Sequence, residues 1–147
     1  MENRQTTPKQ IGLSVKRFLK KADLRATPRY LPFIDLNKGY RPRYCLNNCE
    51  SEQSETGCSI RYGWVLWENK TGRFIEAEFH AVAEIDGELR DITPRIDGEE
   101  VVLFVPDATR QPTRIDHRTW QTWSNIKSHG GRIDETTRSI TICDVGT

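Results

Sequence analysis

The sequence predicts a compact α+β domain in which helices come first along the chain and an antiparallel sheet follows. Apolar residues recur at helical spacing near the N-terminus, whereas most later segments alternate apolar and polar residues as half-buried strands do. Short turn signals separate these later segments, as in a meander. At 147 residues, we expect a flexible N-terminus over 1–8 and one domain over 9–147.

The first helix is expected to start at Thr7-Pro8, because threonine caps a helix and proline fits its first turn. The residues that would face the core are Ile11, Val15, Phe18, Leu19 and Ala22. Residues 25–44 contain three prolines, which predicts an irregular segment. A short helix is then expected over 45–53, beginning at or near Cys45 and ending over 54–57.

Alternating or continuous apolar runs predict strands over 63–68, 74–85, 89–93, 101–105 and 139–143, with a turn at 69–72. Asp116 is expected to cap a further helix that runs through Trp120, Trp123 and Lys127. Gly130-Gly131 would end that helix.

Composition and charge exclude several classes of protein. Lys and Arg number 22 against 21 Asp and Glu, so a net charge of +1 argues against a nucleic-acid partner. The apolar runs are too short to span a membrane, and the first residues do not resemble a secretory signal. Four cysteines without such a signal favour free thiols in a reducing compartment, so we expect a cytoplasmic location.

His80 and Asp91 are separated by a short hairpin. Asp86-Gly87 is a strong signal for a two-residue turn, since both positions tolerate positive φ. Such a turn pairs Ile85 with Glu88 and places Asp91 on the same sheet face as His80, as its diagonal neighbour. A carboxylate beside an imidazole is the arrangement that orients a general base. Glu76 and Glu78 share this face and are alternative partners.

Cys45 completes a possible nucleophilic site. A helix N-terminus and a nearby imidazolium favour the thiolate, and the Cys45 amide would donate to a developing oxyanion. Tyr44, Asn47 and Asn48 are alternatives for a second donor. Trp64 and Trp67 should lie on opposite faces of one strand, so one of them would border a cleft.

These residues resemble the papain-like superfamily of cysteine hydrolases, and within it the transglutaminase-like branch. The resemblance rests on a cysteine at a helix start, the strand containing His80-Ala81-Val82, a glycine turn, and Asp91-Ile92-Thr93-Pro94. It covers roughly residues 44–94 and extends to small bacterial and phage proteins. The chain departs from the superfamily in the short separation of Cys45 and His80, and in the absence of glutamine over 37–44.

The resemblance implies a papain/transglutaminase-like core and a Cys-His-Asp triad of Cys45, His80 and Asp91, with Tyr44, Asn48 and Trp64 near the substrate. It further implies a peptidase, deamidase or transglutaminase-like enzyme, without a cofactor, acting on amide bonds of a protein or a small amide.

Other interpretations remain open on the sequence alone. Cys45 is also explained as an ordinary buried residue, and Cys49, one helical turn later, is a second possible nucleophile. Cys45, Cys49, Cys58 and His80 would make a Cys3His zinc site, although their spacing is unlike that of zinc knuckles. A protein-binding or inhibitor protein with a vestigial site is a third alternative.

Overall fold

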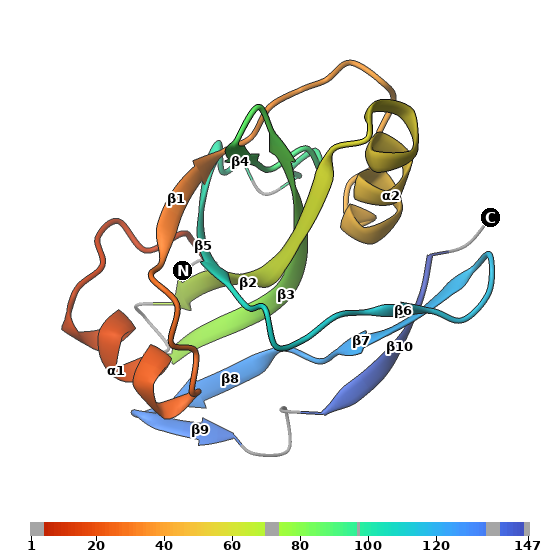
Figure 1. The fold of residues 1–147 in the computed structure, drawn as a ribbon. Helices are drawn as coiled ribbons and strands as arrows, with labels where there is room; N and C mark the ends of the chain where they lie inside the picture. The colour runs from red at the N-terminus through yellow and green to blue at the C-terminus, as the bar shows by residue number, and fades with distance from the viewer. Residues whose placement is uncertain (1–4, 70–73, 97, 135–138, 146–147) are drawn as a thin grey trace.

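Two long antiparallel strands, β2 (Ser59–Asn69) and β3 (Phe74–Ile85), form the centre of the fold (Figure 1). The computed structural model describes residues 5–69, 74–96, 98–134 and 139–145. A seven-stranded antiparallel sheet has the order β1, β5, β2, β3, β8 and β9, and β4 also pairs with β3. The remaining strands of this sheet are β1 (Arg29–Pro32), β4 (Glu88–Arg90), β5 (Val101–Pro106), β8 (Ile126–His129) and β9 (Arg132–Asp134).

A second, three-stranded sheet has the order β10, β7, β6. Its strands are β6 (Thr113–Arg114), β7 (Thr119–Trp123) and β10 (Ile140–Asp144). The described residues contain two helices, α1 (Leu13–Lys21) and α2 (Cys45–Thr56), which lie at opposite ends of the large sheet (Figure 1). The fold is therefore a compact α+β arrangement with mostly antiparallel sheets.

Both helices pack on the same face of the β2–β3 pair. Val15, Phe18 and Leu19 of α1 pack into a cluster with Trp64 and Phe79. Leu46 and Cys49 of α2 meet the small residues Ala81 and Ala83 further along β3. The opposite face of the sheet curves onto itself and buries a third cluster, formed by Leu31, Val65, Trp67, Val82, Val102 and Phe104. Alternation along β2 and β3 supplies both faces with apolar side chains.

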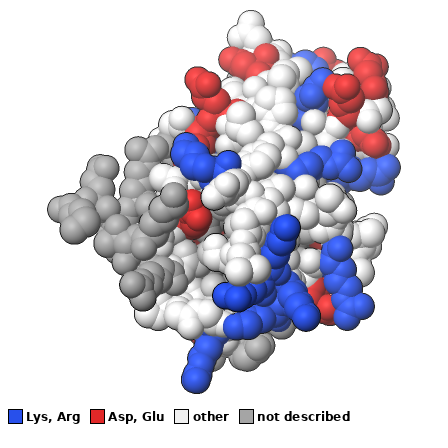
Figure 2. Space-filling view, turned by 90° about the vertical axis from the view of Figure 1, so that its left-hand side faces the viewer, with Lys and Arg blue, Asp and Glu red and all other residues white. Residues whose placement is uncertain are grey.

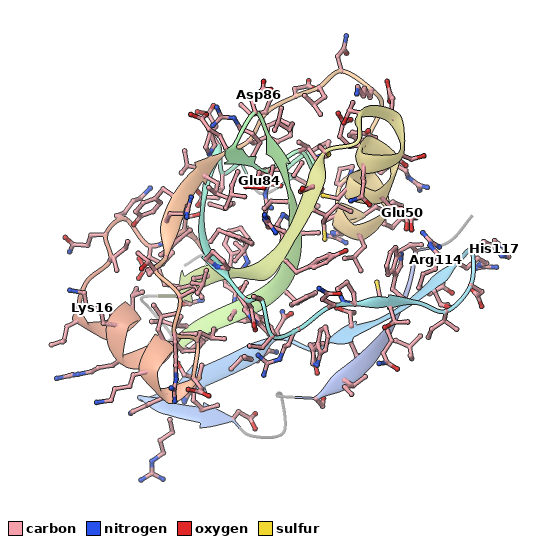
Figure 3. The ribbon with its side chains drawn as sticks, viewed as in Figure 1. Lys16, Glu50, Glu84, Asp86, Arg114 and His117 are labelled. Atoms are coloured by element: carbon pink, nitrogen blue, oxygen red, sulfur yellow. The ribbon has the colours of Figure 1, made fainter. Side chains whose placement is uncertain are left out.

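The second sheet is attached to α2 through Arg114. Its guanidinium bonds to Glu50 at 2.6 Å and to Asn47 at 2.9 Å, and it lies 4.5 Å from the ring centre of Trp120. The Trp120 indole also donates to Asn47, at 2.8 Å. Figure 3 shows Glu50 and Arg114 facing each other between the helix and β6. These contacts hold the second sheet against α2.

The first helix begins later than predicted. It starts at Leu13, with Gly12 as its N-cap, rather than at Thr7-Pro8. The Thr7 hydroxyl donates to the carbonyl of Val101, and the Pro8 carbonyl accepts from the Tyr30 hydroxyl. These long-range bonds hold the segment against the sheet, although it falls within the expected flexible N-terminus.

The helix predicted after Asp116 is wrong. The residues form β7 and β8, and Gly130-Gly131 is the turn into β9, where both glycines have positive φ. Asp116 does accept backbone N–H bonds, from Arg118 and Thr119, but it does so in a turn that leads into β7. The alternate residues Trp120 and Thr122 are buried, which is the period of a strand.

Other predicted elements are confirmed with changed limits. α2 begins at Cys45 and runs to Thr56, where Gly57 takes the left-handed conformation that ends many helices. β2 is longer than predicted, β4 is shorter, and the irregular 25–44 segment contains the edge strand β1. Of the turn predicted at 69–72, Lys70, Thr71 and Gly72 lie outside the described residues.

The β3–β4 hairpin has the predicted two-residue turn. Asp86 and Gly87 both have positive φ, and Ile85 pairs with Glu88. β4 pairs only with residues 83–85 of β3, whereas β8 pairs with residues 74–77 on the same side. Residues 78–82 of β3 therefore lie at a split in the sheet. His80 is at the middle of this split, and Asp91 follows directly after β4.

The described surface has a basic face over α1. Lys16, Arg17, Lys20 and Lys21 lie on this helix, and Figure 2 shows Lys and Arg side chains gathered on the lower part of that side of the molecule. Within the described residues, no helix is both long and apolar enough to cross a membrane.

We predict that Gly63→Ala destabilises the protein by about 3 kcal/mol, because an added methyl group would meet backbone atoms. A Cβ at Gly63 would lie 2.2 Å from the carbonyl oxygen of Val105 and 2.9 Å from Cα of Pro106. Urea unfolding followed by tryptophan fluorescence measures the change. Gly12→Ala is the control, since its Cβ would have only an ordinary contact at 3.9 Å; equal losses in both variants would contradict the prediction.

Candidate active site

A cleft of about 690 Å³ opens at the split in the large sheet. Its walls come from the start of α2, the middle of β3, residues 93–96, and the β7–β10 side of the second sheet. Cys45, His80, Thr93, Trp123 and Cys143 all line it. We refer to this space as the cleft throughout.

Cys45 is the first residue of α2 and is half-buried at the cleft wall. The side chain of the N-cap residue Tyr44 makes no capping bond to the helix. The first turn of a helix carries backbone N–H groups without intrahelical partners, and its dipole favours a negative charge there. Cys45 therefore lies at the end of the helix where backbone N–H donors are available.

His80 and Asp91 form a buried pair. Nε2 of His80 lies 3.0 Å from Oδ1 of Asp91, as the hairpin register predicted. Burial by itself would lower the pKa of His80. The nearby Asp91 carboxylate, the Cys45 sulfur and hydrogen bonds to both outweigh burial and raise this pKa well above its usual value. The imidazole is thus readily protonated in the folded protein.

The geometry assigns different tasks to the two ring nitrogens of His80. Nε2 is bonded to Asp91, so Nδ1 is the nitrogen that remains to exchange a proton with Cys45. His80 thus has the Asp91 carboxylate at Nε2 and the Cys45 thiol as a second hydrogen-bond partner.

Asp91 is held by more than the histidine. Its Oδ1 also accepts the backbone N–H of Thr93 at 3.3 Å, and its Oδ2 lies 3.5 Å from Nη1 of Arg95. Burial would raise the pKa of Asp91, but His80, Arg95 and the Thr93 N–H together lower it below its usual value. Asp91 is fully buried and remains ionised because of these partners.

The other three cysteines are less suited to be nucleophiles. Cys49 is fully buried, and burial together with nearby negative groups raises its pKa well above the usual value, so its thiol stays protonated. Burial also raises the pKa of Cys143, which lines the cleft. Cys58 is half-buried beside the α2 cluster and does not line the cleft.

The four residues weighed as zinc ligands do not form a metal-binding group. Within the described residues, which include Cys45, Cys49, Cys58 and His80, no set of three or more His, Cys, Asp or Glu side chains has a ligating arrangement. His80 is instead engaged by Asp91 and Cys45.

Of the three residues expected near the substrate, only Tyr44 lines the cleft. Asn48 is buried behind it and bonds to the Arg41 carbonyl at 2.9 Å and to the Thr93 hydroxyl at 3.1 Å. Asn48 does not line the cleft, and it joins α2 to the segment after Asp91. Trp64 is buried on the other face of the sheet, where its indole donates to Asp107.

Trp64 and Trp67 lie on opposite faces of β2, as expected, and Trp67 is the one that lines the cleft. Arg95 and Trp123 also line it and were missed. The only sequence signal for Arg95 is a positive charge four residues after Asp91. Trp123 had been placed on a helix, so its position beside Phe79, at 5.0 Å between ring centres, was not foreseen.

Comparison of the chain with protein-family models, curated proteins and solved structures finds no match. The resemblance to papain-like and transglutaminase-like enzymes therefore rests on the residues of the site alone.

We predict that Asp91→Asn changes the pH dependence of stability. The lowered pKa of Asp91 stabilises the folded state above its unfolded-state pKa of about 4, and this contribution is lost as pH falls through the folded-state value. The raised pKa of His80 acts oppositely, since its contribution is complete below about pH 6.5 and is lost as pH rises through the folded-state value. Wild type should exceed Asp91→Asn by about 1–3 kcal/mol near pH 6, and by less at pH 3 and pH 9.

Urea unfolding across this pH range measures the difference. Asp86→Asn, in the exposed β3–β4 turn, is the matched control and should follow wild type closely, because asparagine also tolerates the positive φ of that position. A difference between wild type and Asp91→Asn that does not vary with pH would contradict the charged pairing.

Proposed function

We propose that the protein is a cysteine-dependent hydrolase or acyl transferase that acts on amide bonds through Cys45, His80 and Asp91. The observation that carries this proposal is the buried His80–Asp91 pair directly beside a thiol at a helix start, with Cys45 and His80 both lining one cleft. A papain/transglutaminase-like core would account for this arrangement.

In the first step, Nδ1 of His80 takes the proton of the Cys45 thiol, and the thiolate attacks the substrate carbonyl carbon. The carbonyl oxygen becomes an oxyanion, for which the Cys45 backbone N–H is the nearest helix donor. The C–N bond of the amide then breaks, and the imidazolium gives its proton to the leaving amine. This leaves an acyl group joined to Cys45 as a thioester.

In the second step, water or an amine attacks the thioester while His80 accepts its proton. The Cys45 thiolate leaves and is reprotonated by His80. Throughout both steps, Asp91 holds the imidazole by Nε2 and stabilises its positive charge. The bonds from Thr93 and Arg95 fix the carboxylate for this purpose.

The cleft supplies surfaces for a polypeptide or a small amide. Tyr44, Trp67 and Trp123 offer aromatic contact area, while Glu78 and Arg95 offer opposite charges. Four free thiols are consistent with a reducing, cytoplasmic location.

We predict that iodoacetamide modifies Cys45 at pH 7 at least about tenfold faster than Cys143 in the native protein. The helix start and the His80 imidazolium favour thiolate at Cys45, whereas burial raises the pKa of Cys143. Mass spectrometry of digested protein measures the rate at each thiol. His80→Ala should slow the reaction at Cys45, and His129→Ala should not; equal rates at all four cysteines would sink the assignment.

We predict that the protein turns over acyl substrates and that Cys45→Ala lowers the rate by about a thousandfold or more. Casein supplies peptide bonds and glutamine side chains, so new N-termini, released ammonia and incorporated amine separate the three reactions. Asp91→Asn should lower the rate by about a hundredfold or more, and Cys58→Ala, away from the cleft, by less than about twofold. Activity retained by Cys45→Ala would show that Cys45 is not the nucleophile.

A further inference from the structure

The second sheet has one edge that lacks the usual protection. Among the described residues, β10 pairs with β7 alone, so one side of β10 has no strand beside it. β10 reads Ile-Thr-Ile-Cys-Asp, without proline or lysine, and Ile140 and Ile142 are 60% and 56% exposed. The edge strands of protein sheets normally carry proline or charged residues such as lysine, or are very short, and this prevents pairing with other chains.

The other sheet edges of the described chain follow this rule. β6 has two residues, follows Pro112 and includes the charged Arg114. β9 has three residues, of which Arg132 and Asp134 are charged. β1 ends at Pro32. β10 is longer than these three strands, and its charged residue, Asp144, lies only at its end.

The hydrogen-bond register shows which backbone groups of β10 face outward. The Ser124 N–H donates to the Ser139 carbonyl, and the Val145 N–H donates to the Arg118 carbonyl. Residues alternate in an antiparallel pair, so Thr141 and Cys143 bond toward β7. The N–H and carbonyl groups of Ile140 and Ile142 consequently point to the side where the described residues place no strand.

The same strand borders the reaction centre. Thr141 and Cys143 line the cleft together with Cys45 and His80. Five residues of β10 extend over about 17 Å, so a strand laid along this edge would run beside the cleft over several residues. Figure 1 shows β10 as the outer strand of its sheet, on the side away from β6.

We infer that the substrate is an extended polypeptide segment that adds to β10 as a further strand, bonded to the backbone of Ile140 and Ile142. Main-chain bonds give affinity in this mode, and the exposed isoleucines favour apolar side chains in the segment. The inference rests on the proposed acyl-transfer function, and it selects an unfolded or extended protein region over a small amide as the substrate.

The test compares Ile142→Pro with Ile142→Thr. Proline removes the outward N–H of residue 142 without removing a bond to β7, and threonine keeps that N–H while shortening the side chain. With casein as substrate, Ile142→Pro should lower kcat/KM by about tenfold, and Ile142→Thr by no more than about threefold. Hydrolysis of p-nitrophenyl acetate, which is too small to extend from the cleft to the outer edge of β10, should stay within about twofold in both variants.

A second measurement does not depend on a proline variant that folds. Hydrogen exchange of the Cys45→Ala protein, with and without excess casein, should show added protection in peptides that cover β10. Unchanged casein turnover in Ile142→Pro, or unchanged exchange at β10, would overturn the inference. So would a concentration-dependent dimer that Ile142→Pro abolishes, because a second copy would then occupy the edge. Loss of the proposed function is a separate outcome, in which wild type turns over neither casein nor p-nitrophenyl acetate.

Discussion

The arrangement of the site depends on how the outer edge of β3 is shared. β8 takes the beginning of this edge and β4 takes its end, so the middle of the strand has no backbone partner strand on that side. A single continuous neighbour would fill this space and separate His80 from the start of α2. The split instead lets a buried imidazole reach the carboxylate of Asp91, just after β4, and a thiol from a helix. The two paired ends of β3 thus flank a stretch, centred on His80, that has no partner strand on that side.

Because His80 and Asp91 at this split are buried, a charged group is stable there only if it has partners of opposite charge or hydrogen bonds. Asp91 is fully buried and would be costly to ionise alone, yet it is surrounded by His80, Arg95 and the Thr93 amide. Each partner stabilises the carboxylate, and the carboxylate in turn stabilises a protonated imidazole. A thiolate at Cys45 would complete a row of alternating charges. The row runs from the positive Arg95 through the negative Asp91 and the positive His80 to the negative sulfur. The pair is therefore both part of the core and the source of the chemistry proposed for the cleft.

The sequence was informative where structure depends on neighbouring residues. Positive φ at Asp86 and Gly87 fixed the hairpin, and with it the contact of His80 and Asp91. It failed where distant contacts decide: the spacing of Trp120, Trp123 and Lys127 also suits a helix, and only pairing with remote strands makes it β-structure. Asn48 illustrates the same limit, because its bonds to Arg41 and Thr93 could not be read from its own position.

The wall formed by the second sheet has a consequence for the order of events during synthesis. Trp120 reaches back 73 residues to Asn47 on α2, and β8 pairs with a strand about fifty residues before it. A ribosome that has released Cys45, His80 and Asp91 has therefore produced all three chemical groups, but no cleft around them. The partners of His80 and Asp91 come earlier in the chain, but the cleft walls supplied by β7 and β10 are added only when these two strands join the fold. Any binding that needs both walls of the cleft must therefore wait until the C-terminal strands are in place.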